Sequence, residues 1–195
     1  YRKGNFKQQG DTVYISVIDG EGNACSLINS LYQGFGTGLV VPETGIALQN
    51  RGALFSLNQD HPNIFEPLKR PFNTIIPAMI TRESKLVSSM GVMGGFQQPQ
   101  GHMQVICNMI DYDMSPQSAL DNKRFSVSIE EDLVYLENSF PDEIIKGLGN
   151  RGHNIDIKSG YERGLFGGGQ VINNYKNNVL IGGSDSRKDG QAVSY

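Results

Sequence analysis

The sequence contains few of the side chains that most often build metal centres and disulfide bonds. Its 195 residues include two cysteines, Cys25 and Cys107, and three histidines. Both cysteines lie in apolar patterns, so we expect small core residues and not a disulfide pair. The histidines, at positions 61, 102 and 153, show no metal-ligand spacing with each other or with the cysteines. We therefore predict neither a metal site nor a cofactor.

Long apolar runs and a strong excess of one charge are also missing. No stretch approaches the roughly 20 apolar residues needed to span a bilayer, so no membrane partner is expected. The net charge of −3 argues against nucleic acid as the main partner. No signal-peptide pattern opens the chain, and we expect a cytoplasmic location for this segment, although Tyr1 stands where a natural start would have Met.

Three common catalytic signatures are absent. There is no G-x-S-x-G nucleophile elbow, and the acidic residues are scattered instead of paired, so α/β-hydrolase and glycosidase chemistry have no support. The glycine-rich run Gly34–Gly38 could be taken for a phosphate cradle. It is followed by the extended run Leu39–Pro42, which supplies no helix N-terminus, so we do not predict a nucleotide site there.

The clearest feature that the sequence does contain is a β-hairpin near its start. Residues 12–18 alternate between an apolar face and a more polar one, which predicts a strand. Residues 24–31 suit an antiparallel partner strand. The loop Gly20–Gly22 matches a three-residue hairpin connection.

The register of this hairpin places two hydroxyl side chains opposite each other. If the loop brings Asp19 opposite Asn23, Thr12 lies opposite Ser30, with Cβ atoms roughly 5 Å apart. Such a pair could do no more than stabilise the sheet. It could also place a nucleophile beside a hydrogen-bonding partner, and the hairpin alone leaves both interpretations open.

The rest of the chain alternates between strands and short helices, so the predicted fold class is α+β, in one domain without repeats or linkers. Strands are expected at 45–49, 76–81, 85–90, 125–129, 133–137, 154–158, 170–174 and 179–181, and helices at 97–112, 115–122 and 141–148. Pro99 and the pair Ser115-Pro116 suit helix starts. Residues 50–70 are expected to form a long irregular loop.

A second candidate site feature is the pair Gly94-Gly95, directly before the helix expected at 97–112. Backbone N–H groups at the start of a helix are free and lie at the positive end of its dipole. That arrangement suits an oxyanion hole. A tight turn between strand and helix is the alternative interpretation of the same glycines.

Seven short motifs stand in an order and spacing that resemble one known family. They are Asp11–Tyr14, Asp19–Ser26, Gly34–Gly38, Pro42–Gly45, Lys69–Pro71, Met93–Gly95 and Gly183–Arg187. Each motif is weak alone, but together they cover nearly the whole chain. The sequence resembles the small subunit of the γ-glutamyltransferase (γ-glutamyltranspeptidase) family.

This resemblance implies an N-terminal nucleophile hydrolase fold, an αββα sandwich of two antiparallel sheets between helical layers. Members of the family cut themselves directly before a threonine, which here makes Asp11–Thr12 the processing site. Residues 1–11 would then be a leader, and 12–195 the small-subunit catalytic domain. Cleavage would leave Thr12 with a hydroxyl nucleophile and a free α-amine, whose pKa near 8 lets it act as the base.

The resemblance also assigns roles to other positions. Ser30 matches a hydroxyl residue that hydrogen-bonds the nucleophile, and Gly94 and Gly95 match the oxyanion-hole glycines. Asn73 and Thr74 match residues that hold the substrate carboxylate. The arginine with which the family binds that carboxylate belongs to the large subunit.

Several substrate-binding positions depart from the family's pattern, and one departure is Asn73-Thr74 in place of paired serines. Tyr32 stands where many members have asparagine. Arg51 and Leu54 lie where the enzymes often carry acidic residues that bind the γ-glutamyl α-amine. An ammonium would be repelled by an arginine and finds no partner in a leucine. The chemistry is therefore expected to be kept, while the substrate is open.

The implied function is a γ-glutamyltransferase-like amidohydrolase or acyltransferase that acts on γ-glutamyl compounds such as glutathione. Two alternatives stay open: a related acylase for glutaryl or cephalosporin-type N-acyl amides, and an inactive homologue that is never processed. The expected partners are the large subunit of the same precursor and a small amide substrate. A homo-oligomer of such heterodimers is a further expectation.

Overall fold

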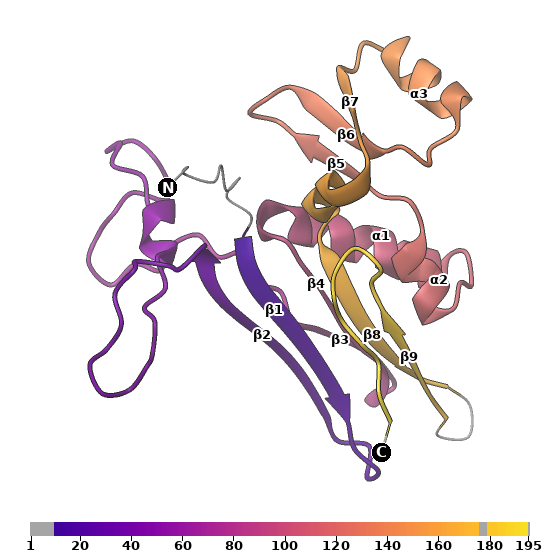
Figure 1. Ribbon diagram of the computed structural model, residues 1–195, viewed down its shortest axis with the longest axis horizontal. Coiled ribbons are helices and arrows are strands. Elements are labelled where there is room, and N and C mark those ends of the chain that lie inside the picture. The colour runs from indigo at the N-terminus through magenta and orange to yellow at the C-terminus, as the bar shows by residue number, and fades with distance from the viewer. Residues whose placement is uncertain (1–9, 176–178, 195) are drawn as a thin grey trace, which may run out of the picture.

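The structure is a computed structural model that describes residues 10–175 and 179–194, and it contains three β-sheets and three α-helices (Figure 1). The first sheet pairs β1 (Gly10–Ile18) with β2 (Ala24–Gln33). The second has the order β3 (Ala78–Arg82), β4 (Lys85–Met93), β8 (Gly168–Asn174), β9 (Leu180–Ser184), with all neighbours antiparallel. The third consists of β5 (Phe125–Ser128), β6 (Leu133–Glu137) and β7 (Ile155–Lys158). The helices are α1 (Gln98–Ile110), α2 (Pro116–Asp121) and α3 (Asp142–Gly149).

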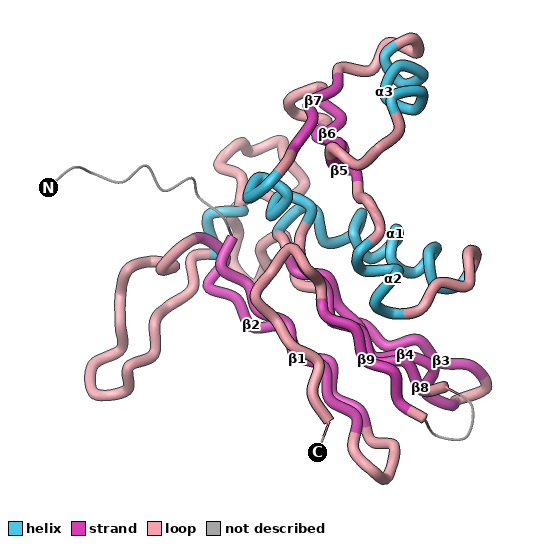
Figure 2. Tube along the Cα trace, turned by 45° about the vertical axis from the view of Figure 1, so that its right-hand side comes forward, coloured by secondary structure: helices cyan, strands magenta, loops and turns pink. Residues whose placement is uncertain are grey.

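These elements form layers around the four-stranded sheet. Helices α1 and α2 lie on one face of this sheet, and the hairpin β1–β2 runs beside its other face (Figure 2). The third sheet and α3 form a separate lobe above the helices (Figure 1). The α+β class is therefore confirmed, with a small lobe that the sequence did not reveal.

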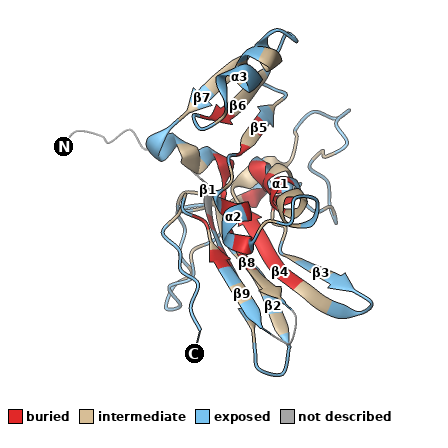
Figure 3. Cartoon of the chain, turned by 90° about the vertical axis from the view of Figure 1, so that its right-hand side faces the viewer, coloured by how far each residue is buried: buried red, intermediate tan, exposed pale blue. Residues whose placement is uncertain are grey.

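The main hydrophobic core lies between the four-stranded sheet and the helices. Its fully buried members are Met90, Val92, Val105, Ala119, Leu120 and Val171. Figure 3 shows this buried zone along β4, β8 and the inner sides of α1 and α2. Two helix starts follow the sequence rules. Pro99 lies in the first turn of α1, and Ser115 Oγ accepts a hydrogen bond from the Ser118 backbone N–H at 3.2 Å.

The predicted register of the first hairpin is confirmed. Thr12 pairs with Ser30, and the Asp19 N–H donates to the Asn23 carbonyl at 3.0 Å. The Asp19 carboxylate also accepts from the Glu21 backbone N–H at 2.9 Å, which makes an Asx turn, and from the Asn23 backbone N–H at 2.8 Å, which closes the loop. Turn chemistry and period-two alternation together fix this register.

In this hairpin the apolar face is exposed and the more polar face is buried, which is the reverse of a simple amphipathic strand. The face of Val13, Ile15 and Val17 is open to solvent, with 41 to 56% of each residue exposed, whereas Thr12 and Tyr14 are buried. Cys25 lies on the open face, so its prediction as a core residue is wrong; Cys107 is half-buried.

Several expected elements differ in the structure. Residues 45–49 form no strand, only a single bridge between Val40 and Ala47. The irregular loop expected at 50–70 contains a 3₁₀ helix, Arg51–Leu54. Another 3₁₀ helix, Gly160–Phe166, was not predicted from the sequence. Strands β6 and β7 pair in parallel, because α3 forms the crossover between them.

Two further expectations concern the N-terminal leader and membrane-spanning segments. Residues 1–9 of the expected leader lie outside the described residues, and β1 begins at Gly10. Within the described residues, no helix is both long and apolar enough to cross a membrane.

Candidate active site

The candidate nucleophile, Thr12, lies near the start of β1 and opposite Ser30 of β2. Its Oγ1 is 2.9 Å from Ser30 Oγ, and only 8% of the residue is exposed. Alternation along β1 turns Thr12 inward on the same face as Tyr14. The opposition of the two hydroxyls is thus an observed contact, while their catalytic roles stay a prediction.

The hydrogen bonds of Ser30 determine the direction of this contact. Ser30 Oγ accepts from the Tyr32 backbone N–H at 2.9 Å and from Arg51 Nη2 at 3.1 Å. A hydroxyl has two acceptor lone pairs and one proton to donate. Because both lone pairs are used, the Ser30 proton points to Thr12 Oγ1. The Thr12 oxygen is therefore an acceptor here, and its own proton stays available to a base.

The backbone is irregular at the predicted processing site. The pairing of β1 with β2 shifts between Asp11 and Thr12, because Asp11 pairs with Tyr32 and Thr12 pairs with Ser30. Leu31 is the extra residue of this β-bulge. Tyr32 has a φ of 76°, in the left-handed region that tyrosine rarely adopts. The bond predicted to be cut therefore lies where the ladder is already interrupted.

Arg51, at the start of the 3₁₀ helix, is buried beside this pair of hydroxyls. Its Nη1 donates to Thr74 Oγ1 at 2.8 Å, its Nη2 donates to Ser30, and its guanidinium lies 5.1 Å from the centre of the Tyr32 ring. Only 7% of Arg51 is exposed, and burial lowers the pKa of its guanidinium. Among the described residues, no carboxylate forms an ion pair with it.

The two residues predicted to hold a substrate carboxylate lie in different surroundings. Thr74 is buried, and its hydroxyl accepts the bond from Arg51. Asn73 is exposed, and its Oδ1 accepts from the Ile75 backbone N–H at 3.1 Å. In this structure Thr74 therefore faces the site, and the side chain of Asn73 is engaged by its own loop.

Gly94 and Gly95 follow the last residue of β4, and two contacts between β1 and β4 indicate by extrapolation that this end of β4 lies on the side of Thr12. Ser16 Oγ donates to Ser89 Oγ at 2.7 Å, and the Tyr14 ring covers Gly91, where an added Cβ would meet Cε2 at 2.5 Å. From Ser16 to Tyr14 the chain moves back two residues along β1, and the contacted residue moves forward two residues along β4, from Ser89 to Gly91. The next step takes Thr12 to the Met93–Gly94 end of β4.

The two glycines have backbone conformations that suit a sharp turn. Gly94 has a φ of 145° and Gly95 a φ of 59°, and both values strain residues with a Cβ. A Cβ on Gly94 would lie 2.8 Å from Gly167 Cα, so the neighbouring backbone also requires glycine. A 3₁₀ turn, Gly95–Gln97, then leads into α1, and the first N–H groups of such a turn lie outside its internal hydrogen bonding. Both the oxyanion-hole and the tight-turn interpretations agree with this geometry.

The predicted site residues thus divide into groups. Five form one contact cluster, namely Thr12, Ser30, Tyr32, Arg51 and Thr74. Gly94 and Gly95 lie at the adjoining end of β4, and Asp11 precedes the cluster in the backbone. Asn73 lies outside it.

A seam of hydroxyl groups between the hairpin and β4 was missed by the sequence reasoning. Tyr14 Oη and Ser26 Oγ are 2.7 Å apart, and Ser26 Oγ also donates to the Met90 carbonyl at 3.3 Å. With the Ser16–Ser89 bond, this seam fixes how the hairpin lies on the sheet. The signal for it was the polar face of the alternation, because a polar face that packs on another strand must satisfy its hydrogen bonds inside the protein.

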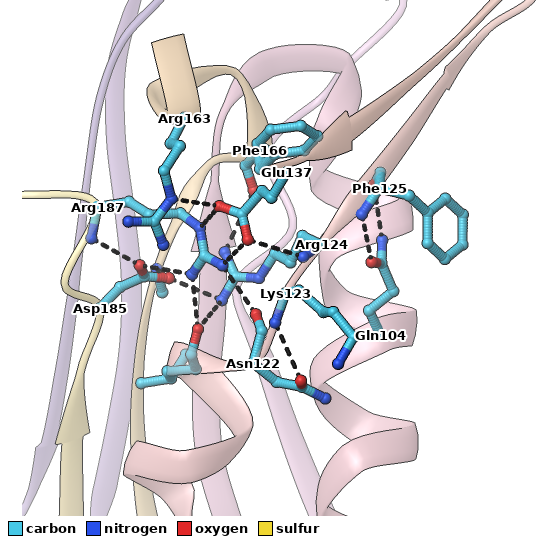
Figure 4. Close-up of polar contacts among 12 residues, drawn as sticks. Gln104, Asn122, Lys123, Arg124, Phe125, Glu137, Arg163, Phe166, Asp185 and Arg187 are labelled. Carbon is cyan, nitrogen blue, oxygen red and sulfur yellow. Dashed lines mark hydrogen bonds and ion pairs between the residues drawn. The ribbon is translucent and has the colours of Figure 1, made fainter. Parts of the chain in front are cut away.

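A buried network of charges was also missed (Figure 4). Arg187 makes bonds of 2.7 and 2.6 Å to the two carboxylate oxygens of Glu137, and its Nη1 lies 3.1 Å from Asp185. Arg124 pairs with Asp185 at 2.7 Å, and Arg163 donates to Glu137 at 2.8 Å. Glu137 and Asp185 are completely buried, and each has at least two charged partners.

This network supports the strand that borders the candidate oxyanion turn. Asp185 Oδ2 accepts from the Gly169 backbone N–H at 3.0 Å, and Gly169 pairs with Val92 near the end of β4. Burial tends to raise the pKa of Glu137, but the hydrogen bonds from Arg187 and Arg163 outweigh it and hold that pKa below its usual range. The carboxylate is therefore charged at neutral pH and ties three segments together.

The described part of the chain holds no group of three or more His, Cys, Asp or Glu residues that could bind a metal ion. The cluster around Thr12 itself offers the hydroxyl groups of Thr12, Ser30 and Thr74 and the buried guanidinium of Arg51.

Comparison with solved structures identifies the fold. The chain superimposes on a cephalosporin acylase from Bacillus halodurans with a TM-score of 0.86 and 45% identity, over 93% of this chain and 34% of that one. A gamma-glutamyltranspeptidase from Pseudomonas nitroreducens, 23% identical, superimposes with a TM-score of 0.82 over 93% of this chain and 98% of that one. The fold is that of the N-terminal nucleophile hydrolases, as predicted.

Comparison with known sequences identifies the family. The glutathione hydrolase-like YwrD proenzyme of Bacillus subtilis is 40% identical over 187 residues, which are 94% of this chain and 35% of the relative. The oxamate amidohydrolase proenzyme of Klebsiella pneumoniae is 34% identical, over 98% of this chain and 37% of the relative. The chain thus spans about a third of the length of these relatives. The profile of the family described as gamma-glutamyltranspeptidase matches residues 2–195, and the chain belongs to that family.

Proposed function

We propose that the chain is the nucleophile-bearing part of a γ-glutamyltransferase-like amidohydrolase or acyltransferase that matures by cleavage at Asp11–Thr12. The observation that carries this proposal is the 2.9 Å contact between Ser30 Oγ and Thr12 Oγ1 at the bulged end of the hairpin. A Thr/Ser pair that only stabilised a sheet would need neither the bulge nor the three hydrogen bonds on Ser30.

In maturation, Thr12 Oγ attacks the carbonyl carbon of Asp11, and the hydroxyl proton passes to the Thr12 nitrogen as the peptide C–N bond breaks. Water then hydrolyses the resulting ester. The products are an Asp11 carboxyl group and Thr12 with a free amine and a free hydroxyl. The irregular backbone at this bond favours the attack, because fewer ladder hydrogen bonds must be broken to move the two residues.

In turnover, the Thr12 amine takes the hydroxyl proton while Oγ attacks the carbonyl carbon of an amide substrate. The oxyanion that forms is stabilised by the N–H groups at Gly94 and Gly95. The C–N bond breaks, the proton is passed to the leaving amine, and an ester to Thr12 remains. Water or an acceptor amine then attacks the ester and restores the hydroxyl. Ser30 donates to Oγ throughout and stabilises its negative character.

The proposed protein partner is the large subunit of the same precursor. Both curated relatives above are named proenzymes and are about three times as long as the matched segment. The open face of the hairpin is contiguous and apolar, with Val13, Ile15, Val17 and Leu27 each at least 41% exposed. Exposed apolar faces of this kind mark interaction surfaces, and the large subunit is the occupant that the length of the relatives supports.

A second candidate function is hydrolysis of N-acyl amides that lack a γ-glutamyl group. The specific observation in its favour is Arg51, a buried cation where a γ-glutamyl ammonium would need an anion. One similar protein is named for oxamate and one solved relative for cephalosporin, so both kinds of amide belong in the test.

The test uses the full-length gene product and its Thr12→Ala variant, with Thr81→Ala in exposed β3 as the matched control. On a denaturing gel, we expect wild type and Thr81→Ala to show two bands, the smaller beginning at Thr12 by mass spectrometry. Thr12→Ala should show one band and no amide hydrolysis with γ-glutamyl or glutaryl anilides. Cleavage that persists in Thr12→Ala would refute the proposed role, and a single uncleaved wild-type band would favour an inactive homologue.

A further inference from the structure

We infer that Arg51 is an anion-selecting residue, and that the acyl group this site accepts carries its own carboxylate one or two carbon atoms beyond the scissile carbonyl and no ammonium. This inference rests on the proposed function of Thr12 and adds the class of substrate. The carrying observation is a buried guanidinium two hydrogen bonds from the nucleophile.

The first step concerns the charge of Arg51. An arginine stays protonated in proteins, and a buried charge without a counter-charge is costly. Arg51 is 7% exposed, and its two observed side-chain acceptors are neutral hydroxyls, those of Ser30 and Thr74. Two of its five N–H donors are used in this way. The remaining donors and the positive charge suit an anion, and a carboxylate fits the planar guanidinium best.

The second step concerns distance. Thr12 Oγ1 lies 2.9 Å from Ser30 Oγ, which lies 3.1 Å from Arg51 Nη2. The nucleophile and the guanidinium nitrogen therefore lie within about 6 Å of each other, and a charged hydrogen bond takes about 3 Å of that distance. With carbon–carbon bonds of about 1.5 Å, an oxalyl or malonyl ester fills the rest. An extended glutaryl chain overshoots Arg51 and would have to fold back.

The third step concerns what the site lacks for a γ-glutamyl group. That group carries an ammonium, which needs an acidic or carbonyl partner. The cluster of Thr12, Ser30, Tyr32, Arg51 and Thr74 contains no carboxylate, and Arg51 would repel the ammonium. Leu54, at the other end of the same 3₁₀ helix, offers an apolar side chain. The same charge that attracts a carboxylate therefore excludes the amino-acid form of the substrate.

The experiment measures kcat/KM for ammonia release by the processed full-length enzyme. The series oxamate, malonamate, succinamate and glutaramate, in which the acyl chain grows by one carbon atom at a time, tests acyl length. Oxamide, in which the carboxylate of oxamate is replaced by a neutral amide, tests charge, and glutamine tests the ammonium. We expect oxamate or malonamate to be best, and oxamate to exceed oxamide by roughly 10- to 100-fold.

Variants of Arg51 separate its charge from its shape. Arg51→Gln should reduce the ratio of kcat/KM for oxamate to kcat/KM for oxamide to within about threefold of unity. Arg51→Lys should keep part of this preference, because lysine retains the charge without the planar fork. Arg82→Gln, an exposed arginine at the end of β3, is the matched control and should leave the ratio unchanged. Titration of oxalate into the same proteins gives a readout without turnover: binding should weaken most in Arg51→Gln, less in Arg51→Lys, and not in Arg82→Gln.

The outcomes that overturn the inference are distinct from those that overturn the proposed function. A ratio that Arg51→Gln does not change, a best substrate at glutaramate, or faster release from glutamine would each refute the anion-selecting role while leaving Thr12 as the nucleophile. An Arg51→Gln variant whose subunits no longer associate would assign the guanidinium to a carboxylate of the large subunit and also refute it. A processed enzyme with no acyl-Thr12 detectable by mass for any amide would refute both.

Discussion

Two buried arginine environments in this protein differ in one respect, the presence of carboxylates. In the network around β6, Arg124 and Arg187 lie against Asp185 and Glu137 at 2.6 to 3.1 Å. Beside the nucleophile, Arg51 has hydroxyl groups and a tyrosine ring. Both environments are buried, but only in the first do described carboxylates neutralise the arginine charge.

The difference indicates what each arginine is for. A buried ion pair whose hydrogen bonds are complete holds segments together, and removing one member leaves an uncompensated charge. A buried cation that keeps unused donors next to a nucleophile instead resembles a binding site prepared for a ligand. The network should therefore dominate stability, and Arg51 should dominate selectivity.

The largest effect on stability is expected from Glu137→Gln. It removes the charge that two arginines share, and the cost should be on the order of 3 kcal/mol in the free energy of unfolding. Urea unfolding of the purified protein measures it. Glu66→Gln is the matched control, because its pair with Lys69 is exposed, and a change within about 0.5 kcal/mol is expected. Equal losses in both variants would contradict the comparison.

The pH dependence of stability provides the next test. The folded-state pKa of Glu137 lies below its ordinary value of 4.5, so its contribution is complete above about pH 4.5 and is lost as pH falls through the folded pKa. The stability difference between wild type and Glu137→Gln should therefore be constant near neutral pH and shrink in more acidic solution. A difference that grows on acidification would show that the carboxylate is not stabilised by its arginines.

The smallest expected effect is that of Arg51→Gln on stability. Since no described carboxylate loses its partner, the free energy of unfolding should change by less than about 1 kcal/mol, and a gain is compatible with relief of an unpaired charge. The urea measurement used for Glu137→Gln detects it. A loss as large as that of Glu137→Gln would mean that Arg51 is a structural residue like Arg187.

The parts of the fold that local rules determine could be predicted from the sequence. The register of β1 and β2 followed from alternation and from the length of the loop between Asp19 and Asn23. The starts of α1 and α2 followed from Pro99 and Ser115. The contact between Thr12 and Ser30 is a direct consequence of that register.

The features that depend on long-range packing could not be predicted. The alternation did not reveal that the hydroxyl face of the hairpin lies on β4, because the partners Ser16 and Ser89 are 73 residues apart. Cys25 was wrongly predicted to lie in the core for the same reason, because the sequence does not show which face of the hairpin is buried. The position of Arg51 was known only from the resemblance, and its contacts required the chain to fold back from residue 51 to residues 30 and 74.

The outward position of Cys25 on β2 has a practical consequence. Its thiol lies opposite Val17 on the open apolar face of the hairpin, whereas Cys107 is half-buried on α1. A maleimide reagent would therefore modify Cys25 readily wherever that face is uncovered, and slowly wherever another polypeptide covers it. The rate of alkylation at one natural side chain can thus follow subunit assembly in real time, without an engineered label.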